Sequence, residues 1–222
     1  MAHGPTAGAS VAAVVPRPTS EPTERATRPG KGERSRRAIL AAAIARFGSD
    51  GFRATSVADI ARDAEVSGSL AYAYFDDKED LFLAALDRDV DALVREGVSS
   101  VLETPGDPSW RDALIFSLVD ALELHPLARR VLAGLEPKVT ARMIELPALE
   151  ELRAAVAERL RADQRLGIVR DDVDPASIGR GIVSIYISLL MSVVQFGTAK
   201  LHADGADVMA VLGAAVDPPA GT

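Results

Sequence analysis

Small hydroxyl, aromatic and basic side chains gather between residues 34 and 78, in types and spacings suited to contacts with DNA. Hydroxyl groups and backbone N–H groups at a helix N-terminus bind phosphate, and arginine and lysine neutralise it. Short side chains let a helix approach base edges, and apolar ones contact thymine methyl groups. The candidate DNA-contacting residues are Arg34, Arg37, Arg53, Thr55, Ser56, Ser67, Gly68, Ser69, Leu70, Tyr72, Ala73, Tyr74 and Lys78.

Several of these candidates also have a plainer interpretation. Tyr72 and Tyr74 lie two positions apart, so on a helix they point about 200° apart and cannot share one role; both could simply pack. Leu70 and Ala73 could be ordinary solvent-facing residues. Lys78 falls at the start of a predicted helix, where a cation opposes the helix dipole. This unfavourable placement favours a phosphate contact for Lys78 over a merely solvated side chain.

The apolar residues around these candidates recur at helical spacing. A first helix is predicted over about residues 33–47, with Gly48 and Gly51 ending it. A second is predicted over about residues 56–64, with Thr55 or Ser56 as its N-cap. Both helices therefore end or begin close to candidate phosphate-binding groups.

A third, short helix is predicted over about residues 68–74, with Ser67 as its N-cap. A longer helix follows, capped by Asp76 or Asp77. Two short helices joined by a turn of three or four residues form a helix-turn-helix. The sequence thus predicts a three-helix DNA-binding domain near the N-terminus.

No strand pattern appears beyond residue 100, and the remaining apolar periods are helical. The predicted fold is all-α with about nine helices: the helix-turn-helix domain, then a helical ligand-binding and dimerisation domain. We expect a disordered N-terminal arm over residues 1–30. The DNA-binding domain should span residues 31–80, and the regulatory domain residues 81–217.

Composition excludes several other classes of protein. The 222 residues include no cysteine and only three scattered histidines, so no disulfide, metal site or cofactor is expected. No nucleophile–base pair or phosphate loop points to an enzyme. The absence of cysteine fits a cytoplasmic protein. Residues 31–80 hold eight basic and nine acidic residues, so DNA binding requires the charges to be segregated in space.

One apolar stretch reaches the length of a membrane span. Residues 181–199 carry no charge over 19 positions. Serine, glutamine and threonine interrupt this stretch, so we expect a buried helix of a soluble protein and no membrane partner.

The stretch from Gly51 to Phe82 resembles the TetR (tetracycline-repressor) family of bacterial transcriptional regulators. Every spacing of the family's pattern is matched without a gap. The matching residues are Gly51-Phe52, Thr55-Ser56, Ile60-Ala61, Val66-Ser67, Tyr72-Ala73-Tyr74-Phe75 and Lys78-Glu79.

The resemblance implies that Tyr72 faces the phosphate backbone, that Tyr74 lies near the helix end, and that Phe75 lies in the core. Glu65 stands where the family often has a glycine, so we expect a positive φ there and modest strain. The predicted recognition helix carries neither lysine nor arginine, so we expect no arginine–guanine contact from it.

For the second half, the resemblance implies a ligand pocket and dimerisation through the last two helices, about residues 175–201 and 204–216. The first of these is apolar on more than one face, which independently favours a covering partner chain. Aliphatic residues predominate, which favours an apolar ligand. The candidate ligand contacts, each with a structural or surface alternative, are Trp110, Phe116, His125, Arg129, Met143, Tyr186 and Gln195.

Together these features predict a DNA-binding transcriptional regulator. It would bind a pseudo-palindromic double-stranded operator as a homodimer, act as a repressor, and be released by a small-molecule effector. Two alternatives remain: the same fold acting without a small-molecule effector, or a small-molecule-binding helical protein whose helix-turn-helix is vestigial.

Overall fold

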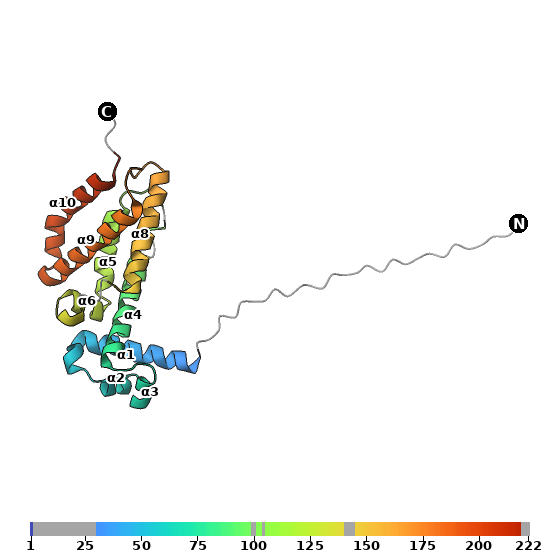
Figure 1. Cartoon of the computed structure of the whole chain (residues 1–222), viewed down its shortest axis with the longest axis vertical. Coiled ribbons are helices and arrows are strands. Elements are labelled where there is room, and N and C mark those ends of the chain that lie inside the picture. The colour runs from blue at the N-terminus through green and yellow to red at the C-terminus, as the bar shows by residue number, and fades with distance from the viewer. Residues whose placement is uncertain (2–29, 99–100, 104, 140–144, 219–222) are drawn as a thin grey trace.

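A computed structural model describes Met1 and residues 30–98, 101–103, 105–139 and 145–218. Every regular element in these residues is a helix, which confirms the all-α prediction (Figure 1). The helices are α1 (Lys31–Ala54), α2 (Val57–Asp63), α3 (Gly68–Tyr72), α4 (Lys78–Val98), α5 (Trp110–Leu122), α6 (Pro126–Leu132), α8 (Pro147–Arg165), α9 (Pro175–Phe196) and α10 (Thr198–Val216).

Helices α1, α2 and α3 gather at one end of the molecule, and α4 leads away from them (Figure 1). The apolar face predicted for α1 is buried there, against apolar residues of α2 and α4. Phe47 and Phe82 meet edge to face with their ring centroids 4.9 Å apart. Phe52 completes an aromatic cluster, with its ring centroid 5.4 Å from that of Phe82. These contacts join the helix-turn-helix to the start of α4.

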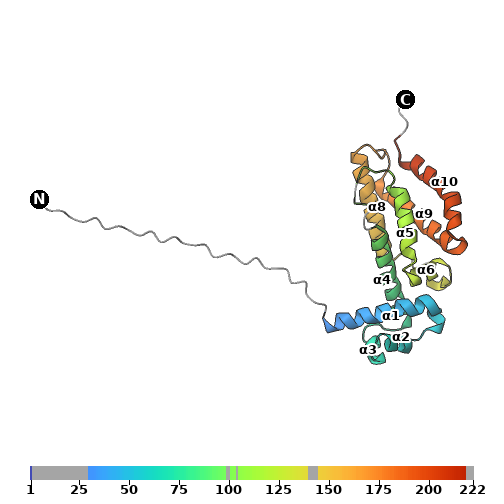
Figure 2. The same ribbon diagram turned by 180° about the vertical axis from the view of Figure 1, so that it is seen from behind.

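The remaining helices form the larger part of the molecule. In both views α9 lies between α8 and α10 (Figures 1 and 2). Helix α4 packs against α1 at one end and against α5 and α8 along the rest of its length. A single apolar core runs through both parts of the chain. The domain boundary at residue 80 stays a prediction, since α4 continues across it.

Asp163 of α8 is a buried hub for three donors. Its carboxylate accepts from Arg159 Nε and from Trp110 Nε1, each at 3.0 Å. It also accepts from the backbone N–H of Gly106 at 3.0 Å. Asp163 is 0% exposed and Arg159 is 3% exposed. The hub therefore ties the start of α5 to α8 through a desolvated ion pair.

A second buried carboxylate joins α4 to α6. Asp89 accepts from the backbone N–H groups of Leu127 and Ala128, at 3.1 and 2.9 Å. These N–H groups lie in the first turn of α6, so Asp89 satisfies donors that the helix leaves unpaired. His125 Nδ1 lies 2.9 Å from the same carboxylate. Pro126 occupies the first position of α6, where its missing N–H leaves no donor unpaired.

The predicted end of the first helix is wrong. Gly48 lies inside α1, where an added Cβ would come 2.8 Å from the Cβ of Pro126. This glycine allows α6 to approach closely rather than stopping the helix. Gly51, with φ 84°, makes a kink, after which α1 continues to Ala54. Gly51 itself leaves the helical conformation, with φ 84° and ψ 170°, so it interrupts the helix as predicted, and only Gly48 departs from the prediction.

The predicted boundaries of the last two helices are also wrong. Helix α9 ends at Phe196 rather than near residue 201, because Gly197 takes φ 87°. Helix α10 then begins at Thr198 rather than at residue 204. By length and composition α9 is long and apolar enough to cross a membrane. A core helix of a soluble protein can have the same length and composition. In the described chain, 28% of the most apolar 18-residue stretch of α9 is buried.

Two predictions fall on residues outside the described part of the chain. One is the disordered N-terminal arm, of which residues 2–29 are not described. The other is ligand contact by Met143.

Candidate nucleic-acid interface

The turn between α2 and α3 is a complete Schellman motif. Val66 N–H donates to the carbonyl of Ala61 at 2.9 Å, and Glu65 N–H donates to that of Arg62 at 3.1 Å. Glu65 has φ 56°, the one non-glycine residue with positive φ in the described chain. This is the strained position that the resemblance implies. The turn satisfies the last carbonyls of α2 and sets the direction of α3.

Relief of this strain is a measurable effect. Glu65→Gly is expected to raise the free energy of unfolding by about 0.5–1 kcal/mol, because glycine adopts positive φ without the Cβ clash. Glu65→Ala is the matched control, since it removes the carboxylate but keeps the clash. Urea unfolding followed by circular dichroism measures both. Equal stabilisation by both variants would show that charge rather than backbone strain is responsible.

Two serines open the helices on either side of this turn. Ser56 Oγ accepts from Asp59 N–H at 3.1 Å and caps α2. Ser67 Oγ accepts from Leu70 N–H at 3.2 Å and caps α3. Both predicted caps are confirmed, and both serines are exposed. Both hydroxyls therefore lie at exposed helix starts, the positions at which phosphate binds.

Helix α3 presents a small, exposed face. Ala71 is buried and fixes the helix to the core, whereas Tyr72 is 58% exposed. Nothing lies within 4 Å of a Cβ added at Gly68, so this face is open. The other exposed predicted residues on this face are Ser67, Ser69 and Ala73; Leu70 is half-buried.

Tyr74 has a structural role. Its hydroxyl donates to the carbonyl of Gly32 at 3.0 Å and its ring packs on the core. The contact joins the end of α3 to the first turn of α1. It brings the basic start of α1 close to the recognition helix but occupies the hydroxyl predicted to contact DNA. The packing interpretation thus describes Tyr74, whereas Tyr72 remains exposed.

Thr55 and Lys78 also turn inward. Thr55 is 3% exposed, and its hydroxyl donates to the carbonyl of Gly51 at 2.9 Å. Lys78 Nζ donates to the carbonyls of Phe52 and Thr55, at 2.8 and 3.0 Å. The ammonium also lies 4.3 Å from the centre of the Phe52 ring. These contacts, rather than a phosphate, explain a lysine at the first position of α4.

Replacing Lys78 distinguishes its internal hydrogen bonds from the phosphate contact predicted for it. Lys78→Met is expected to lower the free energy of unfolding by about 1–2 kcal/mol, because two carbonyls lose a charged donor. It should leave the salt dependence of DNA binding unchanged. Arg37→Gln is the comparison, since loss of a phosphate contact lowers the salt slope by about one. If Lys78→Met lowers the slope of DNA affinity against salt in fluorescence anisotropy, Lys78 does contact a phosphate and the internal role is contradicted.

The basic start of α1 supplies the positive charge of this surface. Arg34 and Arg37 are exposed, as a phosphate-contacting role requires. Arg36, between them in the same basic run, is also exposed and lies 5.6 Å from the centre of the Phe75 ring. Arg53 lies elsewhere, at the end of α1.

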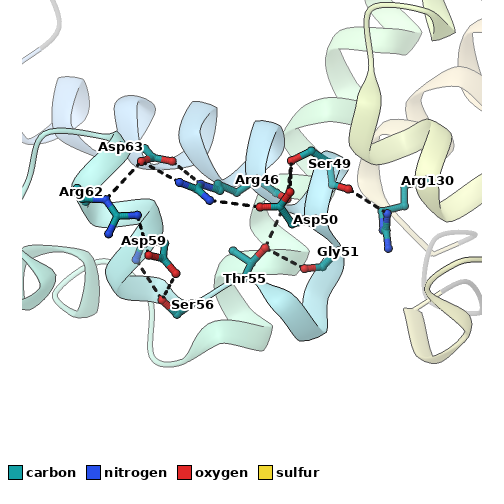
Figure 3. A network of polar contacts seen from close by, with 10 residues as sticks. All are labelled: Arg46, Ser49, Asp50, Gly51, Thr55, Ser56, Asp59, Arg62, Asp63 and Arg130. Atoms are coloured by element: carbon teal, nitrogen blue, oxygen red, sulfur yellow. Dashed lines mark hydrogen bonds and ion pairs between the residues drawn. The ribbon is translucent and has the colours of Figure 1, made fainter.

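Asp50 of α1 and Asp59 and Asp63 of α2 are engaged in ion pairs, as Figure 3 shows. Arg46 bonds Asp63 of α2 at 2.5 Å and Asp50 at 3.3 Å. The hydrogen bond from Arg46 lowers the pKa of the Asp63 carboxyl. Hydrogen bonds from Ser56 and Arg62 likewise lower the pKa of the Asp59 carboxyl. These pairs offset the acidic charge that composition alone places in this domain.

The acids at the start of α4 are used as caps. Asp77 Oδ1 accepts from Asp80 N–H at 2.8 Å, and Asp80 Oδ2 accepts from Asp76 N–H at 3.1 Å. This reciprocal arrangement places Asp77 at the N-cap, one of the two residues predicted. The carboxylates therefore stabilise the helix that leaves the DNA-binding end.

The predicted ligand contacts do not converge. Trp110 and Tyr186 are buried; the Tyr186 hydroxyl donates to the carbonyl of Arg111 at 2.7 Å. Gln195 donates to the carbonyl of Leu132 at 3.2 Å, and Arg129 pairs with Glu123. Phe116 is 47% exposed, and His125 lies in the Asp89 contact described above. None of these residues lines the three described cavities. Ligand contact by any of them stays a prediction.

Comparison with known proteins agrees with this geometry. Residues 39–85 match the model of the bacterial regulatory proteins of the tetR family. HTH-type transcriptional regulator HbdR of Aromatoleum sp. (strain CIB) is 31% identical over 146 residues, which cover 59% of this chain and 62% of that relative. The match thus spans less than two thirds of the length of that relative.

Solved structures share the fold. A protein of Mesorhizobium loti MAFF303099 assigned to TetR-family regulators gives a TM-score of 0.66 at 22% identity, over 86% of this chain and 100% of that one. The fatty acid degradation regulator FadR of Bacillus halodurans gives 0.63 at 20% identity, over 84% and 96%. At these identities the likeness shows the fold alone.

A capped helix-turn-helix with an open recognition helix, on an otherwise helical chain, has the geometry of a DNA-binding module. Residues 39–85 match the tetR family of bacterial regulatory proteins, and the fold of the described chain is similar to that of solved TetR-family regulators.

Proposed function

We propose that the chain is a cytoplasmic repressor, which binds a pseudo-palindromic operator as a homodimer and is released by a small molecule. The open face of α3 beside the basic first turns of α1 carries the DNA-binding part. Small side chains let α3 enter the major groove, while Ser56, Tyr72 and the α1 arginines contact phosphates on either side. Base recognition then relies on hydroxyls and apolar contacts, because α3 has no cationic side chain.

Uncovered faces of α9 and α10 support the homodimer. Gly181, Ser184 and Ser188 are exposed along one side of α9, and Val211 of α10 is 66% exposed. The two serine hydroxyls donate to carbonyls one turn back, at 2.9 and 3.0 Å, so they need no outside partner. Small, internally satisfied residues beside an exposed apolar one suit close packing against a second copy. Two copies would present two recognition helices to two half-sites.

The release step rests on differential affinity. A small molecule relieves repression only if it binds more tightly to an arrangement in which the two recognition helices no longer fit the operator spacing. Helix α4 is suited to transmit such a change, because it packs on α1 at one end and on α5 and α8 along its length.

One observation favours regulation without a small-molecule effector. Trp110, His125 and Tyr186, the buried aromatic residues of the second half that were predicted to contact a ligand, all have internal hydrogen-bond partners. In that second candidate, the abundance of the chain or a protein partner would control repression.

Fluorescence anisotropy tests the proposal on the DNA upstream of the chain's own gene, as such regulators often control themselves. We expect tight binding that weakens steeply with salt, and a dimer mass in solution. Tyr72→Ala should weaken binding, whereas Leu124→Ala, at a 73% exposed site on the C-terminal side of α5, should not. Equal effects of the two variants, or a monomeric chain on DNA, would contradict the proposal.

A further inference from the structure

A cavity of about 530 Å³ lies where the helix-turn-helix meets the rest of the molecule. The end of α1, the start of α4 and the segment that follows α6 line it. This volume falls within the range of small-molecule sites, about 300–1,000 Å³. Its apolar wall consists of Phe52, Phe82, Leu135, Pro137 and Val139.

Residues in and after α6 hold the end of α1 that forms one wall of the cavity. Arg130 Nε and the backbone N–H of Phe52 both donate to Glu136 Oε1, at 2.8 and 3.0 Å. An added Cβ at Gly51 would overlap the Arg130 guanidinium. The kink in α1 is therefore packed against Arg130 and Glu136 of the regulatory half, and Arg130 Nη1 also donates to the carbonyl of Ser49 in α1 at 3.4 Å (Figure 3).

The acidic and basic residues around the cavity differ in whether they have partners of opposite charge. Among its acidic residues, Asp50 pairs with Arg46, Glu136 pairs with Arg130, and Glu79 also has an interaction partner. Its two remaining basic residues are Arg53 and Lys138. Both are exposed, and neither makes an ion pair with any residue that the structure describes. The rim thus offers two cations to an anionic group.

We propose that this junction cavity binds a small apolar molecule that carries one carboxylate. The apolar body packs on Phe52, Leu135 and Val139, and the carboxylate lies between Arg53 and Lys138. A carboxylate is the matching group, because it accepts charge-assisted hydrogen bonds from both cations while the apolar chain leaves water. The binding site stands independently of DNA; its regulatory role rests on the function proposed above.

The cavity has a short physical link to the recognition helix. Phe52 lines the cavity, and its carbonyl accepts from Lys78 Nζ at 2.8 Å. Lys78 also bonds the carbonyl of Thr55, immediately before the N-cap of α2. A molecule against the Phe52 ring therefore touches the contact that positions α2 relative to α4.

Isothermal titration calorimetry on the 222-residue chain without DNA tests the site, with decanoate as the probe. We expect one decanoate per chain, and at least about tenfold weaker binding by Arg53→Gln/Lys138→Gln, which removes both charged partners. Arg88→Gln/Arg161→Gln, two arginines outside the cavity lining, is the matched control and should bind as the wild type does. Decyltrimethylammonium, with the same chain and opposite charge, should bind at least about tenfold more weakly than decanoate.

Ala54→Trp fills the cavity from an exposed lining position and should abolish decanoate binding, with the helical circular dichroism unchanged. No heat of binding, or binding unaffected by the cavity variants, would overturn the proposal. Anisotropy with operator DNA separates the two claims. DNA binding without decanoate binding overturns this inference alone, and decanoate binding without DNA binding overturns the proposed function alone.

Discussion

Asp163→Ala is expected to lower the free energy of unfolding by about 3–5 kcal/mol, the cost of leaving a buried charge without its partner. Arg159 would keep its buried guanidinium with no carboxylate to offset it, although two backbone carbonyls still accept from it. The indole N–H of Trp110 and the backbone N–H of Gly106 would lose their acceptor as well. Urea unfolding followed by circular dichroism measures the change.

Asp172→Ala is the matched control for this substitution. Asp172 pairs with Arg170 at 2.5 Å, but its side chain is 60% exposed. A solvent-exposed pair contributes at most about 1 kcal/mol, so this variant should remain close to the wild type. Arg159→Met/Asp163→Ala should be less destabilised than Asp163→Ala alone, since no unpaired charge remains. A loss below about 1 kcal/mol for Asp163→Ala would contradict the role of the hub.

Ser69→Glu is expected to weaken operator binding by at least about 100-fold. The side chain lies on the open face of α3, where a carboxylate would meet phosphates and base edges, and like charges in contact cost several kcal/mol. Within the part of the chain that the structure describes, the Ser69 hydroxyl bonds only Ser67 Oγ, at 3.0 Å, so the fold should tolerate the change.

Ala154→Glu adds the same charge at an exposed position on α8, far along the chain from the helix-turn-helix, and should leave DNA binding nearly unchanged. Anisotropy at fixed salt compares the two variants. Similar affinities for both would show that α3 does not face the DNA.

The parts of the candidate interface that the sequence predicted are those set by neighbours in the chain. Ser56 and Ser67 each accept from the backbone N–H three residues later in the chain. The turn at Glu65 is closed by a hydrogen bond between two residues five positions apart. Such contacts depend on residue type and short spacing, which a sequence displays directly. The apolar face of α1 was predictable for the same reason.

The side chains that turned inward could not be predicted, because their partners come from distant positions. Lys78 bonds carbonyls 26 and 23 residues away, and Tyr74 bonds one 42 residues away. A cation at a helix start suggests an unusual use, but only the packed structure shows that the use is internal. The same holds for Trp110, whose indole partner lies 53 residues along the chain.

Gly48 and Gly51 show that one residue type serves two purposes within one helix. Gly48 admits Pro126 at close range, whereas Gly51 supplies the positive φ of the kink. The sequence marks both as helix breakers, and only the position of α6 separates them.

Selection from a random pool of double-stranded DNA by the 222-residue chain tests the central claim most directly. The account predicts enrichment of an inverted repeat, with half-site centres about one helical turn or a multiple of it apart, because two recognition helices are related by a two-fold axis. Ser69→Glu should enrich nothing. Failure of the wild-type chain to enrich any sequence at low salt would contradict the account.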